Sequence, residues 1–483
     1  MLINGSFIDS EELIAGERDV IDVLNPYNQE KIGHIFCATR DEVVQAVENA
    51  HEVFQHTMKK MPAHRRSQIL RNTADLLELR KEAFAELLTL EAGKPIVEAR
   101  GEVARAIQVL HFAAEGAKNL HGEQIVLDNA IGGEQQFGFS KRVPLGVVAA
   151  ITPFNFPLNM ALHKIAPAIA AGNTIVIKPA EKTPFSTVAL YKLFLEAGLP
   201  SGALNIIQGP GQNLVEPLVT HPLVKKVTFT GSGAVGWKIH EMAKGKKVTL
   251  ELGSNAPNII FDDANIDNAV SSILMGGFTF AGQACVSAQR IFVHESVYDE
   301  FLNKLTEKVS ALRMGDPKEE STQLGPMITE EAAKKAELWI QEAVEAGAVI
   351  CTGGTRNGTF LEPTILENVD LEMKVVCQEV FAPIIAIVPF DTEEEVVNYA
   401  NDSRYGLQAG VFTNNINLAM RVAESLETGG VWINEASVKR YDHIPYGGVK
   451  ESGIGKEGIH YAIEEMTDLK FIGMKILSRI NGQ

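Results

Sequence analysis

Between residues 145 and 261 short β-rich runs alternate with helical stretches, and this alternation constrains the fold more than any other feature of the chain. The expected strands are 146–151, 174–177, 204–207, 226–230 and 248–252, and the expected helices are 158–171, 186–197, 212–220 and 234–243. Strand–helix–strand repetition at this spacing predicts a parallel sheet that is covered by helices on both faces. Ligands of such sheets bind where the carboxyl ends of the strands lead into loops.

The rest of the chain divides into segments of different character. Residues 40–120 have the periodicity of amphipathic helices, and a second αβ series runs from about 265 to 435. Its expected strands are 290–293, 385–390, 409–412 and 430–434. Two αβ units in one chain suggest a cleft between them. Segment 122–139 is Gly-rich and β-compatible, and 469–479 is an apolar stretch that could form a lone strand, with an oligomer partner as one candidate neighbour.

Composition excludes several classes of function. The net charge is −17, so nucleic acid and anionic membranes are poor partners, and we expect neither. Four scattered cysteines without a CxxC pair are too few for a disulfide framework or a zinc site, and we expect no metal. No signal peptide and no run of 18 apolar residues is visible, so we expect a cytoplasmic protein. A cysteine with a special role is then more readily catalytic than structural.

The segment 229–236 contains a GxGxxG pattern directly after an expected strand and at the start of an expected helix. In that context the glycines, Gly231, Gly233 and Gly236, would permit a tight turn, and the helix N-terminus would attract a pyrophosphate. Glu251 follows about 20 residues later, where a Rossmann fingerprint has its ribose ligand. The alternative is that these glycines only terminate a strand and begin a helix.

Lys178 and Glu181 leave the sheet together at the end of another expected strand. A lysine and a carboxylate there could hold a ribose diol, with the carboxylate accepting hydrogen bonds from the hydroxyls. A 2′-phosphate would meet Glu181 as a like charge, which favours NAD over NADP. The alternative is a solvated ion pair.

Cys285 lies between a glycine-containing loop and an expected strand, with Gly282 and Gln283 just before it. These neighbours predict a loop that opens to a cleft, where a thiol could act as a nucleophile. A free cysteine is otherwise a small buried apolar residue, and we interpret Cys37, Cys351 and Cys377 in that way.

Asn155 lies between two prolines and two phenylalanines, directly after an expected strand. Its amide would be costly to bury unless it is used, and it could donate to a developing oxyanion. Equally, it could form an Asx turn that caps the next helix.

Together these segments resemble the NAD(P)-dependent aldehyde dehydrogenase superfamily, in order and over essentially the whole chain. The matching positions are Asn155, Lys178 with Glu181, 229–236, 251–253, 282–285, 379–383 and 445–450. The resemblance implies an α/β protein with the aldehyde dehydrogenase fold: two Rossmann-like αβ domains and a small β oligomerisation arm. It places an NAD-binding domain at 1–121 and 140–251, a catalytic domain at 252–464, and the arm at 122–139 and 465–483. Relatives use such an arm to build homodimers or homotetramers.

The resemblance also implies roles in catalysis. Cys285 would attack the aldehyde to form a thiohemiacetal, and the Asn155 amide and the Cys285 backbone N–H would stabilise its oxyanion. After hydride transfer leaves a thioester, Glu251 would activate the water that hydrolyses it, so the ribose role passes from Glu251 to Lys178 and Glu181. The expected cofactor is NAD, with NADP as the alternative. The positions that match cofactor-binding residues are Lys178, Glu181, Thr152, Phe154, Gly231, Ser232, Gly236, Leu252, Glu379 and Phe381. Rivals are an acylating dehydrogenase, whose known members generally lack this glutamate, and a non-catalytic scaffold with the same fold.

Substrate residues are expected in the polar, locally basic segment 435–444. Lys439, Arg440 and His443, together with Arg290 and Arg105, could clamp an anionic tail on a small aldehyde. The alternative is a set of surface charges near the mouth of a tunnel.

Segment 441–445 resembles the branch that contains lactaldehyde dehydrogenases and non-phosphorylating glyceraldehyde-3-phosphate dehydrogenases. Its phosphate-using members usually carry an arginine before the cysteine and a tyrosine after the asparagine, whereas this chain has Ala284 and Phe156. We therefore expect a lactaldehyde, a sulfolactaldehyde or a semialdehyde as substrate, with glyceraldehyde 3-phosphate as the alternative.

Overall fold

The first sheet is built from the strand–helix units that the alternation predicts. The structure is a computed structural model that describes residues 2–3, 6–7 and 19–476. The strand order is β2-β1-β9-β8-β7-β10-β11-β21, in which β9, β8, β7, β10 and β11 are parallel and β1 and β21 pair antiparallel at the edges. The strands are β1 (Leu2–Ile3), β2 (Ser6–Phe7), β7 (Val147–Ile151), β8 (Thr174–Lys178), β9 (Leu204–Ile206), β10 (Val224–Thr230), β11 (Lys247–Glu251) and β21 (Gly453–Ile454).

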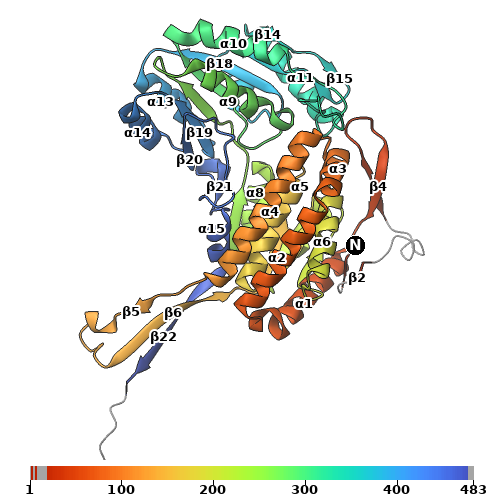
Figure 1. The fold of residues 1–483 in the computed structure, drawn as a ribbon, viewed down its shortest axis with the longest axis vertical. Coiled ribbons are helices and arrows are strands. Elements are labelled where there is room, and N and C mark those ends of the chain that lie inside the picture. Colours follow the sequence, from red (N-terminus) through yellow and green to blue (C-terminus); the bar gives the residue numbers. More distant parts are fainter. Residues whose placement is uncertain (1, 4–5, 8–18, 477–483) are drawn as a thin grey trace, which may run out of the picture.

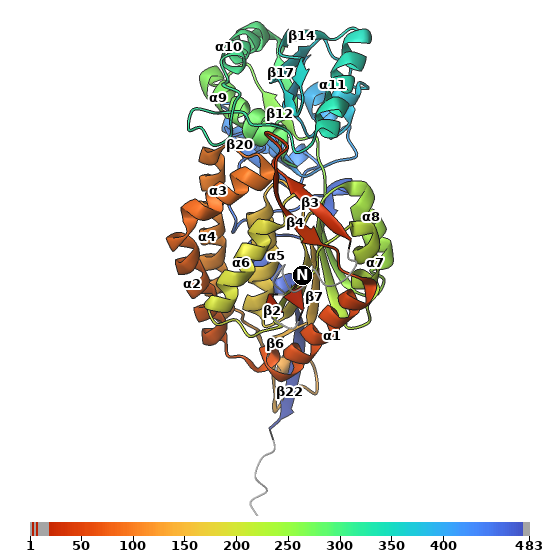
Figure 2. The ribbon, with the colours of Figure 1, turned by 90° about the vertical axis from the view of Figure 1, so that its right-hand side faces the viewer.

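Helices cover both faces of this sheet because its strands are apolar on both sides. Along β7, Val148 and Ala150 face the layer that contains α2, α4, α5 and α6, whereas Val147 and Ala149 face α1, α7 and α8. Figure 2 shows these two layers on opposite sides. The helices are α1 (Arg40–His56), α2 (Ala63–Leu79), α3 (Lys81–Ala92), α4 (Ile96–Lys118), α5 (Pro157–Ala171), α6 (Phe185–Glu196), α7 (Gly211–Thr220) and α8 (Gly233–Met242).

The second sheet forms a lobe of its own, drawn at the top of Figure 1. Its order is β14-β17-β18-β13-β12-β19-β20, parallel except at β14. The strands are β12 (Pro257–Ile260), β13 (Arg290–His294), β14 (Val349–Thr352), β17 (Thr364–Glu367), β18 (Ile384–Phe390), β19 (Gln408–Phe412) and β20 (Gly430–Ile433). Helices α9 (Ile266–Phe278), α10 (Tyr298–Ser310) and α11 (Glu330–Glu345) pack on one face, and α13 (Glu393–Asn401) and α14 (Ile416–Ser425) on the other.

An arm projects from the first lobe, at the bottom of Figure 1. It is the three-stranded sheet β22-β6-β5, with β5 (Gln124–Ile125), β6 (Gln136–Pro144) and β22 (Thr467–Lys475). Strand β6 extends beyond residue 139, at which the Gly-rich segment 122–139 expected from the sequence ends. The arm presents Leu469, Phe471 and Met474, each about half exposed. The predicted final strand thus forms, although residues 477–479 of that prediction lie outside the described residues.

Agreement with the sequence is closest in the first lobe, where all the strands and helices predicted between 146 and 252 form with shifts of one or two residues at their ends. The four strands predicted in the second lobe also form. An antiparallel ribbon of β3 (Val20–Leu24) and β4 (Lys31–Phe36) was not predicted, nor were β12, β14 and β17. No helix in the described residues is long and apolar enough to cross a membrane.

Candidate active site

A cavity of about 960 Å³ lies where the parallel strands of the first sheet end and the second lobe begins. Strands β7, β8, β10 and β11 deliver residues to it from their carboxyl ends, as expected for a parallel sheet. The residues predicted from the sequence that line it are Arg105, Thr152, Phe154, Asn155, Lys178, Glu181, Gly231, Ser232, Glu251, Leu252, Cys285, Glu379, Phe381, Lys439, Arg440 and His443.

The loop before Cys285 has an unusual backbone. Phe280, Ala281 and Gly282 follow one another with φ of 48°, 53° and 67°, a left-handed run that side chains disfavour. The Glu98 carboxylate from α4 accepts the Phe280 N–H at 2.9 Å. At Gly282 an added Cβ would lie 2.1 Å from the Ala382 carbonyl oxygen, so only glycine fits. These constraints fix where the following cysteine enters the cavity.

Asn155 reaches the same loop from the end of β7. Its Nδ2 donates to the Gln283 carbonyl oxygen at 2.8 Å, which leaves one amide hydrogen free of that bond. The helix α5 that follows begins at a buried carboxylate, because Glu102 accepts the backbone N–H groups of Leu158 and Asn159 at 3.1 Å each. The asparagine is therefore held by its own amide and by the anchored helix behind it.

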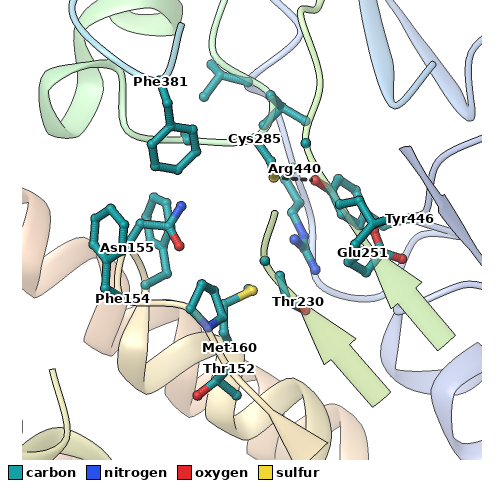
Figure 3. A pocket seen from close by; sticks show the side chains of 18 of the residues that line it. Thr152, Phe154, Asn155, Met160, Thr230, Glu251, Cys285, Phe381, Arg440 and Tyr446 are labelled. Carbon is teal, nitrogen blue, oxygen red and sulfur yellow. Dashed lines mark hydrogen bonds between the residues drawn. The ribbon is translucent and has the colours of Figure 1, made fainter. Parts of the chain in front are cut away.

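The Cys285 sulfur faces the Tyr446 hydroxyl, with 3.1 Å between Sγ and Oη (Figure 3). Burial raises the pKa of the Cys285 thiol to about 11, opposed by the Tyr446 hydrogen bond and the Arg440 charge and reinforced by the carboxylates of Glu379 and Glu251. With these surroundings the thiol is protonated at neutral pH and needs stabilisation of its thiolate in order to react.

Glu251 ends β11 across the cavity from Asn155 (Figure 3). It is 2% exposed, and neither carboxylate oxygen has a hydrogen-bond partner among the described residues. Burial, and then the charge of Glu457, raise the pKa of Glu251 well above its ordinary value. A carboxyl with a raised pKa and free acceptor sites is suited to take a proton from water.

Behind Glu251 lies a buried group of charges. Glu457 pairs with Lys164 at 2.7 Å and with Arg440 at 3.2 Å. Burial works against the charged form of Glu457, but Lys164, His163 and Arg440 outweigh it and hold its pKa below the usual range. Glu457 therefore stays ionised and supplies the negative charge that keeps Glu251 basic.

The opposite end of the cavity has the features of a dinucleotide site. The Glu181 carboxylate pairs with Lys178 at 2.7 Å and accepts the Gly211 N–H at 3.0 Å. The Thr152 hydroxyl is buried and has no partner among the described residues, so it has a hydrogen bond to offer. Helix α8 begins after Ser232 without a side-chain cap, which leaves its first N–H groups for an anion.

Glu379 and Phe381 line the cavity between its catalytic end and its dinucleotide end. The Glu379 carboxylate accepts the Ser254 N–H at 3.0 Å, and burial raises its pKa to about 7. A Cβ at Gly253 would lie 2.2 Å from that carboxylate, so the glycine permits its approach. Phe381, with φ of 54°, lies edge-on to Phe154 with 5.9 Å between ring centroids.

The structure corrects two positions. Arg290 was expected at the substrate end but lies outside the cavity, 3% exposed, with its guanidinium donating to the carbonyls of Asn255, Tyr399 and Ala400. Gly236 was expected to contact cofactor and also lies outside the cavity, because the first turn of α8 packs on Leu252 and Phe229 there. A Cβ on Gly236 would lie 2.3 Å from Leu252 Cδ2, so its role is close helix packing.

The four other residues expected at the substrate end line the cavity. Arg105 binds Asp442 through two hydrogen bonds of 2.7 and 3.2 Å, Lys439 pairs with Glu435 at 2.9 Å, and His443 stacks beside Phe112 with 5.2 Å between centroids. Arg440 lies deeper, beside Cys285 and Tyr446 (Figure 3). Cys37, Cys351 and Cys377 are free and partly buried, and none of them lines this cavity.

Sequence reasoning missed Glu98 and Glu102, which hold the site loops, and it did not foresee that Arg105 binds Asp442. Glu98, Glu102 and Arg105 lie three to four positions apart on α4 and reach the Cys285 loop, the start of α5 and Asp442. Their spacing puts them on one helix face, which is the signal that could have identified them. Within the described residues no group of three or more His, Cys, Asp or Glu side chains is arranged to hold a metal ion.

Comparison with known proteins identifies the family. Residues 13–472 match the model of the aldehyde dehydrogenase family. A 3-sulfolactaldehyde dehydrogenase of Priestia megaterium is 47% identical over 472 residues, 98% of each chain, and a lactaldehyde dehydrogenase of Methanocaldococcus jannaschii is 40% identical over 98% of this chain and 99% of its own. The crystal structure of the glyceraldehyde-3-phosphate dehydrogenase GapN of M. jannaschii, complexed with NADP, is 40% identical with a TM-score of 0.92, covering 95% of this chain and 100% of that one. The chain belongs to the aldehyde dehydrogenase family.

Proposed function

We propose that the protein oxidises a small polar or anionic aldehyde, of the lactaldehyde, 3-sulfolactaldehyde or semialdehyde type, to its carboxylic acid with NAD. One observation carries the proposal: Asn155, Glu251 and Cys285 converge on one cavity with the chemistry that thioester formation and hydrolysis require. A scaffold without catalysis has no need for all three.

Cys285 attacks the aldehyde carbon, and the carbonyl oxygen becomes the oxyanion of a thiohemiacetal. The amide hydrogen of Asn155 that is not used by Gln283, and the backbone N–H of Cys285, donate to that oxyanion. NAD supplies a hydride acceptor when bound, which turns the thiohemiacetal into a thioester.

Glu251 then takes a proton from water, and the hydroxide attacks the thioester carbon and releases the acid and the Cys285 thiolate. The free carboxylate oxygens and the raised pKa of Glu251 support this role. The presence of this glutamate favours hydrolysis over transfer of the acyl group to coenzyme A.

The cofactor end supports a dinucleotide, with NAD preferred. Lys178 and Glu181 would hold the adenosine ribose, the start of α8 with Gly231 and Ser232 the pyrophosphate, and Glu379 and Phe381 the nicotinamide half. Thr152, Phe154 and Leu252 complete this wall. A 2′-phosphate would meet the Glu181 carboxylate, which is the reason to rank NAD above NADP.

The substrate end supports an anionic tail. Arg105, Lys439 and His443 line the cavity and can donate to a sulfonate or carboxylate. The likeness to a 3-sulfolactaldehyde dehydrogenase at 47% identity favours the sulfonate. The likeness to GapN favours a second candidate, glyceraldehyde 3-phosphate. Against it, Phe156 and Ala284 stand where phosphate-using relatives usually carry tyrosine and arginine.

Formation of NADH over a panel of aldehydes tests the proposal. The panel contains 3-sulfolactaldehyde, lactaldehyde, succinic semialdehyde, glyceraldehyde 3-phosphate and propanal. We expect the highest kcat/KM with a short anionic or hydroxylated aldehyde and none with Cys285→Ala, which should still bind NAD. A higher kcat/KM for propanal would contradict the anionic substrate, and consumption of coenzyme A would contradict hydrolysis.

Lys439→Gln and His443→Gln separate recognition from chemistry. Each loses a donor to the tail, so KM for anionic aldehydes should rise about tenfold or more while propanal kinetics stay the same. An equal effect on both substrates would mean that these side chains are surface charges.

We also propose how the chain is organised. Residues 1–121 and 140–251 would form the NAD-binding domain, 252–464 the catalytic domain, and 122–139 with 465–483 the oligomerisation arm. The half-exposed apolar residues of β22 support a homodimer or homotetramer. Sedimentation of Phe471→Asp tests the role of the arm, since a charge there should dissociate the assembly.

Four free cysteines support a reducing, cytoplasmic location.

A further inference from the structure

Tyr446 and Arg440 form a buried pair against the sulfur of Cys285. Tyr446 is 3% exposed and its hydroxyl lies 3.1 Å from Sγ. The Arg440 guanidinium lies over the Tyr446 ring, 3.7 Å from the centroid, and its side chain is 8% exposed. Figure 3 shows the three side chains together on one side of the cavity. No role for Tyr446 follows from the sequence, and the proposed mechanism assigns it none.

Arg440 is held in place from behind. Its Nη2 donates to Glu457 at 3.2 Å, and its Nε lies 3.9 Å from the Asp442 carboxylate. The buried Nε has no hydrogen-bond partner among the described residues, so one N–H of this guanidinium remains unused. A side chain fixed in this way is poorly suited to follow a substrate tail, in contrast to Lys439, whose side chain is 36% exposed at the cavity wall.

We propose that Tyr446 and Arg440 stabilise Cys285 in its nucleophilic form: the Tyr446 hydroxyl donates to the sulfur, and Arg440 orients the ring and supplies positive charge. The hydroxyl suits this task because burial keeps it protonated, and hence a donor, far above neutral pH. A hydrogen bond to a charged acceptor is stronger than one to a neutral acceptor, so the contact favours the thiolate over the thiol. This proposal assigns Arg440 to activation of the Cys285 thiol and not to substrate recognition.

Opposing charges face the same sulfur from other elements. Glu251 at the end of β11 and Glu379 before Phe381 both disfavour the thiolate, and burial disfavours it most. Tyr446 and Arg440, both from the segment after β20, are the groups that act in the other direction. Without them, nothing among the named neighbours would offset the two carboxylates.

Alkylation of Cys285 by iodoacetamide, measured against pH on the protein without NAD or aldehyde, tests the proposal. The reagent is neutral, and the Cys285 peptide is followed by mass spectrometry so that the other cysteines do not contribute. In Tyr446→Phe the midpoint of the rate–pH curve should move up by about one pH unit, with about tenfold slower alkylation below it. The acid limb of kcat/KM should move by the same amount.

Tyr399→Phe is the matched control, because its hydroxyl binds Glu395 far from the cavity and its removal should leave the midpoint unchanged. Arg440→Gln should move the midpoint in the same direction as Tyr446→Phe, and Arg440→Lys should restore part of the shift. An unchanged midpoint of the rate–pH curve in Tyr446→Phe would overturn the proposal. This holds even if Arg440→Gln shifted the midpoint.

The proposal rests on Cys285 being the nucleophile but not on the substrate. A protein that alkylates as expected and oxidises no aldehyde on the panel would contradict the proposed function alone. Loss of the pH shift with normal aldehyde oxidation would contradict only the role of Tyr446 and Arg440.

Discussion

The side-chain amide of Asn155 donates to the Gln283 carbonyl oxygen at 2.8 Å, two residues before Cys285. This bond joins the loop after β7 in the first lobe to the cysteine loop of the second. One amide hydrogen thus fixes the geometry between the lobes, and the other remains for the oxyanion.

Asn155→Ala removes both functions while leaving the cavity open. Loss of one oxyanion donor typically lowers kcat by about 10²–10³, and we expect a fall of that size or more because the loop anchor is lost too. NAD affinity, measured by quenching of protein fluorescence, should stay within about twofold. A kcat near the wild-type value would remove Asn155 from the oxyanion site.

Glu251→Gln separates formation of the thioester from its hydrolysis. The variant keeps the shape of the side chain but cannot accept a proton, so stopped-flow absorbance should show a burst of about one NADH per site and then near arrest. Cys285→Ala should show no burst at all. Steady turnover of Glu251→Gln at the normal rate would assign the base elsewhere.

The raised pKa of Glu251 makes hydrolysis depend on pH in a predictable direction. Only the carboxylate form accepts a proton, and burial with the nearby Glu457 charge keeps Glu251 protonated to higher pH than an ordinary glutamate. Steady-state turnover should therefore rise with pH through that raised pKa. The rate constant for hydrolysis of the thioester, measured after the burst, should be smallest at low pH, and a rate constant independent of pH would contradict this assignment.

The sequence predicts those parts of the fold and the site whose residues are marked by a pattern among near neighbours in the chain. The strands and helices of the first lobe follow from periodicity and turn residues. Asn155 and Lys178 follow from their positions at the ends of strands, and Cys285 from its position between a glycine-containing loop and a strand. By contrast, Arg290 is a charged residue whose three carbonyl partners come from segments far away along the chain, so no local pattern reveals its burial. Tyr446 meets Cys285 across 161 residues for the same reason.

Lys94 and Glu102 form a fully buried ion pair under the site loops, and its disruption should be costly. The Lys94 ammonium lies 3.9 Å from the ring centroid of Phe156 and 4.6 Å from that of Phe280, so it touches both loops that carry the site. Glu102→Gln leaves the ammonium without its counter-charge, which typically costs about 3–5 kcal/mol of unfolding free energy. Urea unfolding measures the change.

The exposed Glu82, which pairs with Arg100 at 2.6 Å, provides the matched control. Glu82→Gln makes the same chemical change at a solvated pair and should leave the urea midpoint nearly unchanged. Equal midpoints for the two variants would show that Lys94 finds another partner. Because Glu102 also anchors α5 behind Asn155, its variant should lose kcat as well as stability.

Glu181 decides between the two dinucleotides through one charge. Its carboxylate forms an ion pair with Lys178 at 2.7 Å, so in the native protein the lysine charge is already paired. A 2′-phosphate would therefore approach the negative carboxylate. Glu181→Ala frees the ammonium of Lys178 for that phosphate and removes the repulsion, so kcat/KM with NADP should rise about tenfold relative to NAD. Glu216→Gln, a change at an exposed pair with Arg40, should leave the ratio as it is. A native protein that prefers NADP would contradict the argument at its start, whereas an unchanged ratio in Glu181→Ala would mean that the ribose lies away from this pair.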